Sequence, residues 1–385
     1  GNGDEPLSAE QTDTLRGWAY VGGCADAFSD KPEWADLNAE IRELLDDDEY
    51  TQARASTLTA YYTPGPVVKA MWDALDIGSA PIQVLEPGCG TGNFMAGIPE
   101  NIKANVSGVE LDPISARIAA ALNPDATILN ADLADCTIHP GFDLTIGNVP
   151  YSGDISLDYR TTDGGTSRLP LHDYFIERSV DALRPGGVAM LLTSRYTLDK
   201  RSETMRADLA RKAELVGAVR LPSSTFARQA GTEAAPFLLV LRRRERTLDR
   251  TPDEAWIHSN PVAVPGYQDV TVNVNQAVAN DMTAHAVGDI RPVIGRFGGD
   301  FDVVFQGDAE QVGERLQELL STQITHGPAL SLGEAEPAGR AEITVRPDHV
   351  APFEYSVDQR GVVWYGDGTT VTEIAHGQGD EARRL

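Results

Sequence analysis

Short apolar runs alternate with amphipathic stretches between residues 56 and 245. The spacing of apolar residues in stretches such as 66–75 and 113–122 predicts helices between the early runs. This alternation is typical of an α/β fold with a largely parallel sheet and helices on both faces. Only residues 222–235 separate the last two runs, which is compatible with an antiparallel hairpin at the sheet edge. The predicted strands are residues 82–86, 106–110, 126–130, 143–147, 187–193, 215–220 and 236–242.

The chain before residue 56 has a helical pattern. Apolar residues recur at three- and four-residue spacing between Trp34 and Leu45, and the acidic run 46–49 follows them. We expect this acidic run to end the helix at the surface. Residues 1–55 are therefore interpreted as a helical N-terminal extension that carries no visible chemistry.

The last third of the chain mixes strand-like pieces with one predicted helix over residues 309–320. This pattern predicts a smaller α+β C-terminal region over residues 246–385, which serves as a connector or binds a partner or DNA. The strand-like pieces are residues 270–274, 302–305, 341–345 and 362–365. The sequence thus predicts three parts, which are residues 1–55, a catalytic domain over 56–245, and residues 246–385.

Charge and composition narrow the class of partner. The 385 residues carry a net charge of −26, which argues against a general polyanion binder because phosphate contacts need Lys and Arg. Residues 195–250 hold 13 of the 32 basic residues, so this segment is the expected electrostatic footprint if nucleic acid binds. The sequence has no apolar run as long as a membrane span and no recognisable signal peptide. Three cysteines without metal-like spacing complete the expectation of a cytoplasmic protein with no metal site.

A glycine-rich segment follows the first predicted strand. It contains Glu86, Gly88 and Gly90, and a further glycine at position 92. Glycines at alternate positions let the backbone turn sharply and approach a ligand closely. Nucleotides bind at the carboxyl ends of strands in such folds. We therefore expect these residues to contact a nucleotide-containing cofactor.

Two acidic residues stand at the ends of the next two predicted strands. Glu110 ends the second strand, where a carboxylate can accept hydrogen bonds from both hydroxyls of a ribose. Asp132, followed by Leu133, comes after the third strand and can accept a hydrogen bond from an adenine amine. Each acid alone is equally well explained as a solvated loop carboxylate, but their register with Glu86 favours a cofactor site. NAD remains a candidate on these features, although the glycines lack the G-x-G-x-x-G spacing.

The tetrapeptide Asn148-Val149-Pro150-Tyr151 follows the fourth predicted strand. It resembles the amino-methyltransferase motif Asn/Asp/Ser-Pro-Pro-Tyr/Phe/Trp, from which it departs at Val149. The resemblance implies that the Asn148 side chain and the carbonyl of residue 149 accept the two protons of an exocyclic amine, whose lone pair then attacks a methyl sulfonium. Pro150 keeps these acceptors preorganised. Tyr151 stacks on a base rotated out of the duplex, a contact that contributes about 1–3 kcal/mol.

Tyr62 and Thr63, followed by proline, resemble a motif that precedes the glycine loop in type I and related adenine DNA methyltransferases. In that family the motif contacts the methionine end of the cofactor. The runs 171–175, 183–187 and 193–200 look like the methyltransferase half of large helicase–methyltransferase polypeptides of phages, plasmids and integrative elements. The resemblance implies a Rossmann-like class I fold with a seven-stranded, mostly parallel sheet. It also implies S-adenosyl-L-methionine as cofactor, N6 of adenine in DNA as acceptor, and a helicase domain in the same parent polypeptide.

Other functions stay open at this point. The methyl acceptor could instead be adenine in RNA, N4 of cytosine or a protein amide. In a second alternative, the domain is a non-catalytic module that binds S-adenosylmethionine or a partner chain. Mobile-element, restriction-modification and anti-restriction systems all fit. His172 is interpreted as a polar residue at a helix start rather than as a general base. Residues 152–168 are expected to be a loop, either closing over the target base or lying at the surface.

Overall fold

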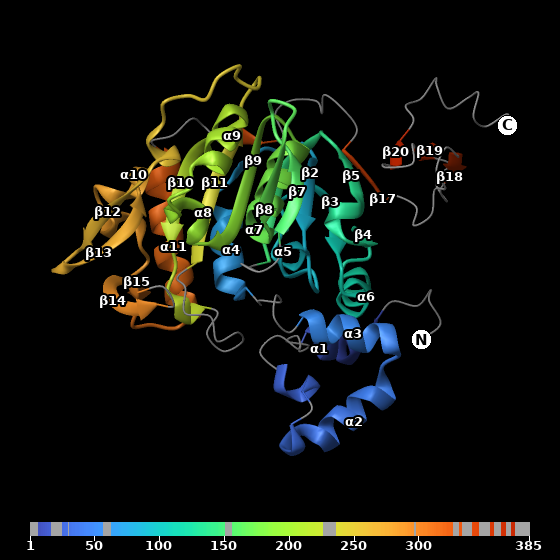
Figure 1. The fold of residues 1–385 in the computed structure, drawn as a ribbon. Coiled ribbons are helices and arrows are strands. Elements are labelled where there is room, and N and C mark those ends of the chain that lie inside the picture. The colour runs from blue at the N-terminus through green and yellow to red at the C-terminus, as the bar shows by residue number, and fades with distance from the viewer. Residues whose placement is uncertain are drawn as a thin grey trace.

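A seven-stranded sheet forms the centre of the molecule (Figure 1). Its strands follow the order β10-β11-β9-β6-β2-β3-β4. The computed structural model describes residues 7–16, 25–29, 31–56, 63–150, 156–225, 236–295, 298–325, 331–332, 341–345, 355–357, 363–366 and 371–373. The strand bounds are β2 Ile82–Pro87, β3 Ala104–Glu110, β4 Thr127–Asn130, β6 Phe142–Asn148, β9 Leu183–Ser194, β10 Ala213–Arg220 and β11 Pro236–Arg243.

The pairing of these strands confirms the predicted fold class. Strand β2 is parallel to β3 and β6, and the parallel pairing continues from β3 to β4 and from β6 to β9. Strand β11 lies between β9 and β10 and is antiparallel to both. The structure therefore has the Rossmann-like class I methyltransferase sheet, with seven mostly parallel strands. The chain order reverses between β2 and β6, and ligands bind outside the carboxyl ends of the strands at such a switch point.

Alternate residues of the central strands enter two different hydrophobic cores. On β9, Ala189 and Leu191 belong to one core, while Val188 and Met190 belong to the other. This follows from the two-residue period of a strand whose faces are both covered, which explains the continuous apolar runs in the sequence. The helices nearest the sheet are α4 Gly65–Asp73, α5 Asn93–Ala96, α6 Pro113–Leu122, α7 Leu171–Ala182, α8 Tyr196–Asp199 and α9 Thr204–Lys212.

The N-terminal helices lie beside α6 at one end of the sheet (Figure 1). Helix α2 ends before the acidic run, as expected, but the same run also begins α3. The N–H of Glu49 donates to Asp46 Oδ1 at 2.8 Å and the N–H of Asp46 donates to Glu49 Oε2 at 3.2 Å, a reciprocal cap. The elements here are α1 Ala9–Arg16, η1 Ala25–Phe28, η2 Pro32–Trp34, α2 Ala35–Leu44 and α3 Asp47–Ser56.

The C-terminal region packs directly on the central sheet. Leu316 and Leu320 of helix α11 complete one core, and Val274 and Phe301 contribute to the other. The elements are η5 Ala255–Ile257, β12 Ser259–Val264, β13 Tyr267–Asn275, α10 Gln276–Ala279, η6 Thr283–His285, β14 Asp289–Gly295, β15 Gly298–Val304, α11 Ala309–Thr325, β16 Ser331–Leu332, β17 Glu342–Val345, β18 Tyr355–Val357, β19 Val363–Gly366 and β20 Val371–Glu373. The predicted boundary at residue 245 therefore does not separate two hydrophobic cores, and the division into three parts stays a prediction.

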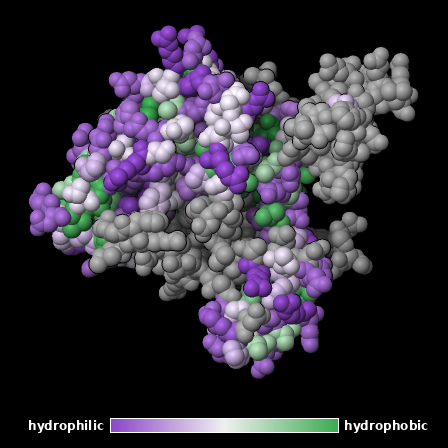
Figure 2. Space-filling model, viewed as in Figure 1, coloured by the Kyte–Doolittle hydropathy of each residue, from purple (hydrophilic) through white to green (hydrophobic). Residues whose placement is uncertain are grey.

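Two short pairings join this region to earlier parts of the chain. Strand β16 is parallel to β1 (Asp76–Ile77), and β17 is antiparallel to β5 (Cys136–His139). The chain thus passes from α11 on one side of the sheet to β17 beyond the opposite edge (Figure 1). Hydrophilic residues cover most of the described surface in Figure 2. Within the described residues, no helix is long and apolar enough to cross a membrane.

The segment expected to be a loop over residues 152–168 largely forms an antiparallel hairpin. Its strands are β7 (Ser156–Arg160) and β8 (Thr166–Pro170), joined by a turn in which Gly164 has a φ of 86°. The expectation of a loop was wrong for these residues, because polar side chains on the exposed face concealed the strand pattern. Residues 151–155 lie outside the described part of the chain.

Candidate active site

The glycine loop leaves β2 in a conformation that only glycine adopts readily. Gly88, Gly90 and Gly92 have φ angles of 71°, 56° and 85°. The N–H groups of Gly88 and the following cysteine both donate to the carbonyl of Val109 on β3, at 2.8 and 2.9 Å. A Cβ at Gly92 would lie 2.5 Å from Asn123 Nδ2. The loop is therefore held tightly against β3, with no room for a side chain at its end.

Glu110 lies beside this loop, and both oxygens of its carboxylate already accept a backbone hydrogen bond. The N–H of Gly90 donates to Oε2 and the N–H of Asp112 donates to Oε1, both at 2.8 Å. Burial nevertheless raises the pKa of Glu110 to about 7. Each oxygen keeps a second lone pair, so the ionised group can still accept from two hydroxyls. Next to it, the Leu111 side chain is 52% exposed, which marks an apolar surface that the sequence analysis missed.

Glu86 is buried in the floor of the site. Its carboxylate accepts from the N–H groups of Phe94 and Met95 at the start of α5, yet burial raises its pKa well above the usual value, and the charge of Glu110 adds to this. Oε2 of Glu86 makes no hydrogen bond within the described residues. A Cβ on Gly147 would lie 3.6 Å from the Glu86 Cγ, so the Glu86 side chain lies against the end of strand β6.

Asp132 and Leu133 differ in exposure. The Asp132 side chain is exposed and accepts from the N–H of Ala134 at 2.9 Å, so it caps the short helix η3 (Leu133–Asp135). Its remaining lone pairs are available to a ligand. The Leu133 side chain is buried in the core, so any contact that it makes with a cofactor involves its backbone.

Thr63 precedes helix α4 and is 2% exposed. Its carbonyl accepts from Asn93 Nδ2 at 3.4 Å, which joins it to the start of α5. Its Oγ1 has no hydrogen-bond partner within the described residues. A buried hydroxyl in this state is ready to donate to a ligand carboxylate. Tyr62, predicted to act beside it, lies outside the described residues.

The tetrapeptide meets the glycine loop directly. A Cβ on Gly88 would lie 3.8 Å from Pro150 Cδ and 3.3 Å from Phe175 Cε1. Asn148 ends β6 and is half-buried. The structure therefore brings the predicted methyl-transfer motif and the predicted cofactor loop into contact. Tyr151 lies outside the described residues.

Val149 replaces the usual proline with a different means of fixing the loop. Its N–H donates to the carbonyl of Leu192 on β9 at 3.0 Å, a bond that proline cannot form. Its side chain is fully buried in the same core as Phe175. The departure from the motif thus preserves a rigid connection between β6 and the following residues.

Comparison with known proteins identifies the family. The family model of N-6 DNA Methylase matches residues 36–261, which is more than half of the chain. This chain belongs to the N-6 DNA methylase family. The methylase is 27% identical over 278 residues to Defense against restriction protein B of Escherichia phage P1, covering 69% of this chain and 12% of that protein.

Two further similarities concern restriction-modification enzymes. The methylase is 28% identical over 166 residues to the Type II methyltransferase M.XamI of Xanthomonas campestris pv. amaranthicola, covering 38% of this chain and 32% of that protein. The crystal structure of the Type I restriction enzyme EcoKI M protein aligns with a TM-score of 0.42 at 12% identity, covering 83% of this chain and 82% of that chain. The chain thus spans 12% and 32% of the lengths of the first two relatives.

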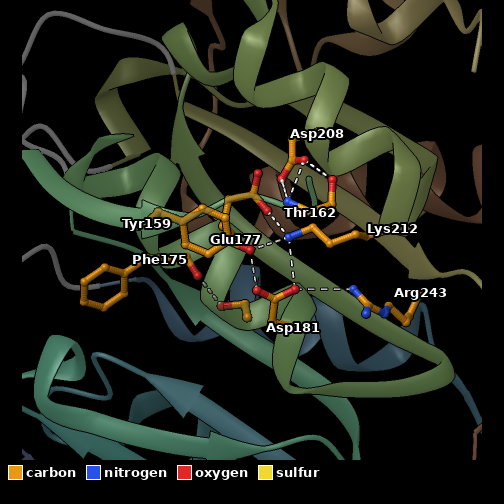
Figure 3. A network of polar contacts seen from close by, with 9 residues as sticks. Tyr159, Thr162, Phe175, Glu177, Asp181, Asp208, Lys212 and Arg243 are labelled. Atoms are coloured by element: carbon orange, nitrogen blue, oxygen red, sulfur yellow. Dashed lines mark hydrogen bonds and ion pairs between the residues drawn. The ribbon is translucent and has the colours of Figure 1, made fainter. Parts of the chain in front are cut away.

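A buried ionic network holds the hairpin that follows the tetrapeptide (Figure 3). Lys212 is 2% exposed and donates to Glu177, to Asp181 at 3.0 Å and to the Tyr159 hydroxyl at 2.5 Å. Tyr159 of β7 in turn donates to Asp181. Burial raises the pKa of Glu177 to about 7, while Lys212 opposes this shift. A second contact, from the N–H of Thr162 to Asp208 at 3.1 Å, fixes the hairpin turn to α9.

Many basic side chains of the segment 195–250 contact other groups of the protein. Arg220 is fully buried, bonds Asp199 with both guanidinium arms at 2.8 and 3.0 Å, and lies over the rings of Phe237 and Phe301. Most other bases of the segment also contact acids or carbonyls inside the protein. They are Arg195, Lys200, Arg206, Arg211, Lys212, Arg243 and Arg244. These side chains are thus engaged in contacts inside the protein, and the electrostatic footprint of this segment stays a prediction.

Proposed function

We propose that this methylase transfers a methyl group from S-adenosyl-L-methionine to the exocyclic N6 amine of adenine in DNA. The observation that carries the proposal is the contact between the tetrapeptide and the glycine loop through Pro150 and Gly88. This contact supports an arrangement in which the acceptor end of the site lies beside the cofactor end. Membership of the N-6 DNA methylase family supports the same reaction.

The cofactor residues divide according to the groups that S-adenosylmethionine presents. Thr63, with its unpartnered buried hydroxyl, would donate to the methionine carboxylate. Glu86, with one unpartnered oxygen, would accept from the methionine ammonium group. Glu110 would hold the ribose hydroxyls, and Asp132 would accept from the adenine amine. Leu111 would cover the adenine ring with its exposed side chain.

The target amine is activated by acceptors rather than by a nucleophile on the protein. The bound cofactor supplies the electrophilic methyl sulfonium. The Asn148 side chain and the carbonyl of Val149 accept the amine protons and turn the nitrogen lone pair toward the cofactor. These acceptors are preorganised because the N–H of Val149 is bonded to β9. Tyr151 stacks on the flipped base.

The proposed binding partners are DNA and a further part of a longer parent polypeptide. DNA is the proposed substrate, and among the described residues of the 195–250 segment most of the bases already contact other groups of the protein. We therefore propose that a further part of a parent polypeptide, such as a helicase domain, contributes to DNA binding. The phage P1 relative is much longer than this chain and is named for defence against restriction. We propose an anti-restriction, restriction-modification or mobile-element setting, and the cytoplasm stays the expected compartment.

Transfer of radiolabelled methyl groups tests the proposal. We expect the wild-type chain to label DNA at adenine N6 and to label RNA and protein far less. Asn148→Ala should abolish labelling while calorimetry still detects cofactor binding. Label in RNA, at cytosine N4 or in protein would replace the proposed acceptor with one of the alternatives. Absence of any cofactor binding by the wild-type chain would overturn the proposal entirely.

A further inference from the structure

The proposed reaction leaves one proton without an acceptor. When the amine nitrogen attacks the methyl group, the C–S bond breaks, its electron pair stays on sulfur, and the nitrogen becomes a cation. The nitrogen must then lose a proton. The Asn148 amide and the carbonyl of Val149 accept hydrogen bonds but are too weakly basic to retain that proton. Water could accept this proton, but a base close to the tetrapeptide would accept it within the site.

Helix α7 brings a histidine to this position. The helix leads directly into β9, and β9 is parallel to β6, so the helix begins at the sheet edge where β6 ends. Phe175 in its second turn lies beside Gly88, where an added Cβ would be 3.3 Å from Phe175 Cε1 and 3.8 Å from Pro150 Cδ. His172 lies three residues earlier, on the same helix face, and helical side chains lean toward the N-terminus. His172 therefore lies one turn beyond Phe175, at the edge of the sheet where β6 ends.

One ring nitrogen of His172 is buried without a hydrogen-bond partner in the described residues. As expected, the residue lies at the start of a helix, as the second residue of α7, and it is only 6% exposed. Its Nε2 lies 3.6 Å from Asp173 Oδ1. Its Nδ1 has no hydrogen-bond partner within the described residues, and neither does Asp173 Oδ1. The nearby carboxylate favours a proton on Nε2, so Nδ1 presents its lone pair.

Asp173 is fixed behind the imidazole. It is fully buried, and its Oδ2 forms an ion pair with Lys200, which follows helix α8. Burial lowers the pKa of His172, and the charge of Lys200 lowers it further, while Asp173 opposes both. The ring is accordingly neutral at neutral pH and ready to accept a proton. Of the histidines in the described residues (positions 139, 172, 258 and 285), this one adjoins the predicted site.

We propose that Nδ1 of His172 accepts the proton that leaves the target amine, with Asp173 as the positioning residue that orients the ring. This inference rests on the proposed function. The products are the methylated amine and S-adenosylhomocysteine, and the imidazolium releases its proton to water after the turnover. General base catalysis of this kind contributes about 10²–10⁴-fold to a rate.

Single-turnover transfer of labelled methyl groups into DNA, with saturating cofactor at each pH, tests the proposal. We expect His172→Gln to lower the rate at least about 100-fold and to leave cofactor affinity within about twofold by calorimetry. The wild-type rate should fall below the pKa of His172, a limb that the variant lacks. Added imidazole should restore part of the rate of His172→Gly but not that of Asn148→Ala. His258→Gln, a half-exposed histidine in the C-terminal region, serves as the matched control.

Three outcomes would overturn the inference. One is a His172→Gln variant that turns over at the wild-type rate. Another is a slow variant that keeps the acid limb of the wild-type profile. The third is a slow His172→Gly variant that imidazole does not accelerate, which indicates a structural role. These results differ from failure of the proposed function, in which the wild-type chain itself transfers no label to DNA.

Discussion

Glu110 connects the structure to a measurable pH dependence of cofactor binding. Burial raises its pKa to about 7, so about half of the molecules hold it protonated at pH 7. The ionised carboxylate accepts hydrogen bonds from hydroxyls better than the protonated acid does. Cofactor affinity should therefore rise as the pH increases through 7 and reach a plateau above pH 8. If only the ionised form binds, the dissociation constant is about tenfold larger at pH 6 than at pH 8, or about 1.4 kcal/mol.

Calorimetric titration with S-adenosylmethionine at pH 6, 7 and 8 measures this dependence. The matched variant is Glu110→Gln, which keeps the size of the side chain but cannot ionise. Its amide NH₂ must face a backbone N–H of Gly90 or Asp112, so we expect weaker binding at pH 8 and a smaller pH slope. Titration of the ligand affects both proteins equally. A flat wild-type profile, or an equal slope in Glu110→Gln, would refute the reasoning.

Three further expectations concern stability. Lys212→Met should lower the free energy of unfolding in urea by about 3–5 kcal/mol because it leaves the buried Glu177 without its cation, and Lys212→Met combined with Glu177→Leu should recover most of the loss. If the double variant were no more stable than Lys212→Met, the lost ion pair would not be the cause of the destabilisation. Val149→Pro should lower the melting temperature, with a cost of about 1–3 kcal/mol, because the buried carbonyl of Leu192 loses its donor; a more stable variant with faster methyl transfer would contradict this. A chain ended at residue 245 should lose cooperative thermal unfolding by circular dichroism, since both cores continue beyond that residue; a cooperative transition at the wild-type temperature would instead support the predicted domain boundary.

The central sheet was predictable because its strands are buried on both faces. Each such strand leaves an apolar run in the sequence, and all seven predicted strands are present with small differences at their ends. Strand β5 was not predicted, since it is only four residues long and its partner β17 lies about two hundred residues later. The β7–β8 hairpin was missed for a related reason. Its stability comes from Tyr159 and Lys212, a contact across 53 residues that no local pattern records.

The candidate site was predictable where its chemistry depends on the backbone. The glycine loop and the tetrapeptide follow strands in consecutive segments, and the sheet topology alone brings them together. The basic segment could not be interpreted in this way, because composition counts charges but not their partners. Arg220 pairs with Asp199, 21 residues earlier, and Arg195 pairs with Asp300, more than one hundred residues later. Part of the segment that composition marks as a DNA surface thus contacts the C-terminal region, as Arg195 does through Asp300.

Some buried polar groups in this methylase pair with each other inside the fold, and others bury an atom without a hydrogen-bond partner. Lys212 and Glu177 satisfy each other inside the fold, and so do the guanidinium arms of Arg220 and Asp199. At the carboxyl edge of the sheet, by contrast, Thr63, Glu86, His172 and Asp173 each bury an atom without a hydrogen-bond partner in the described residues. An unpaired buried group costs about 1–3 kcal/mol, so folding alone does not favour such an arrangement. In the proposed reaction, a cofactor at Thr63 and Glu86 and a target base at His172 would supply these missing partners.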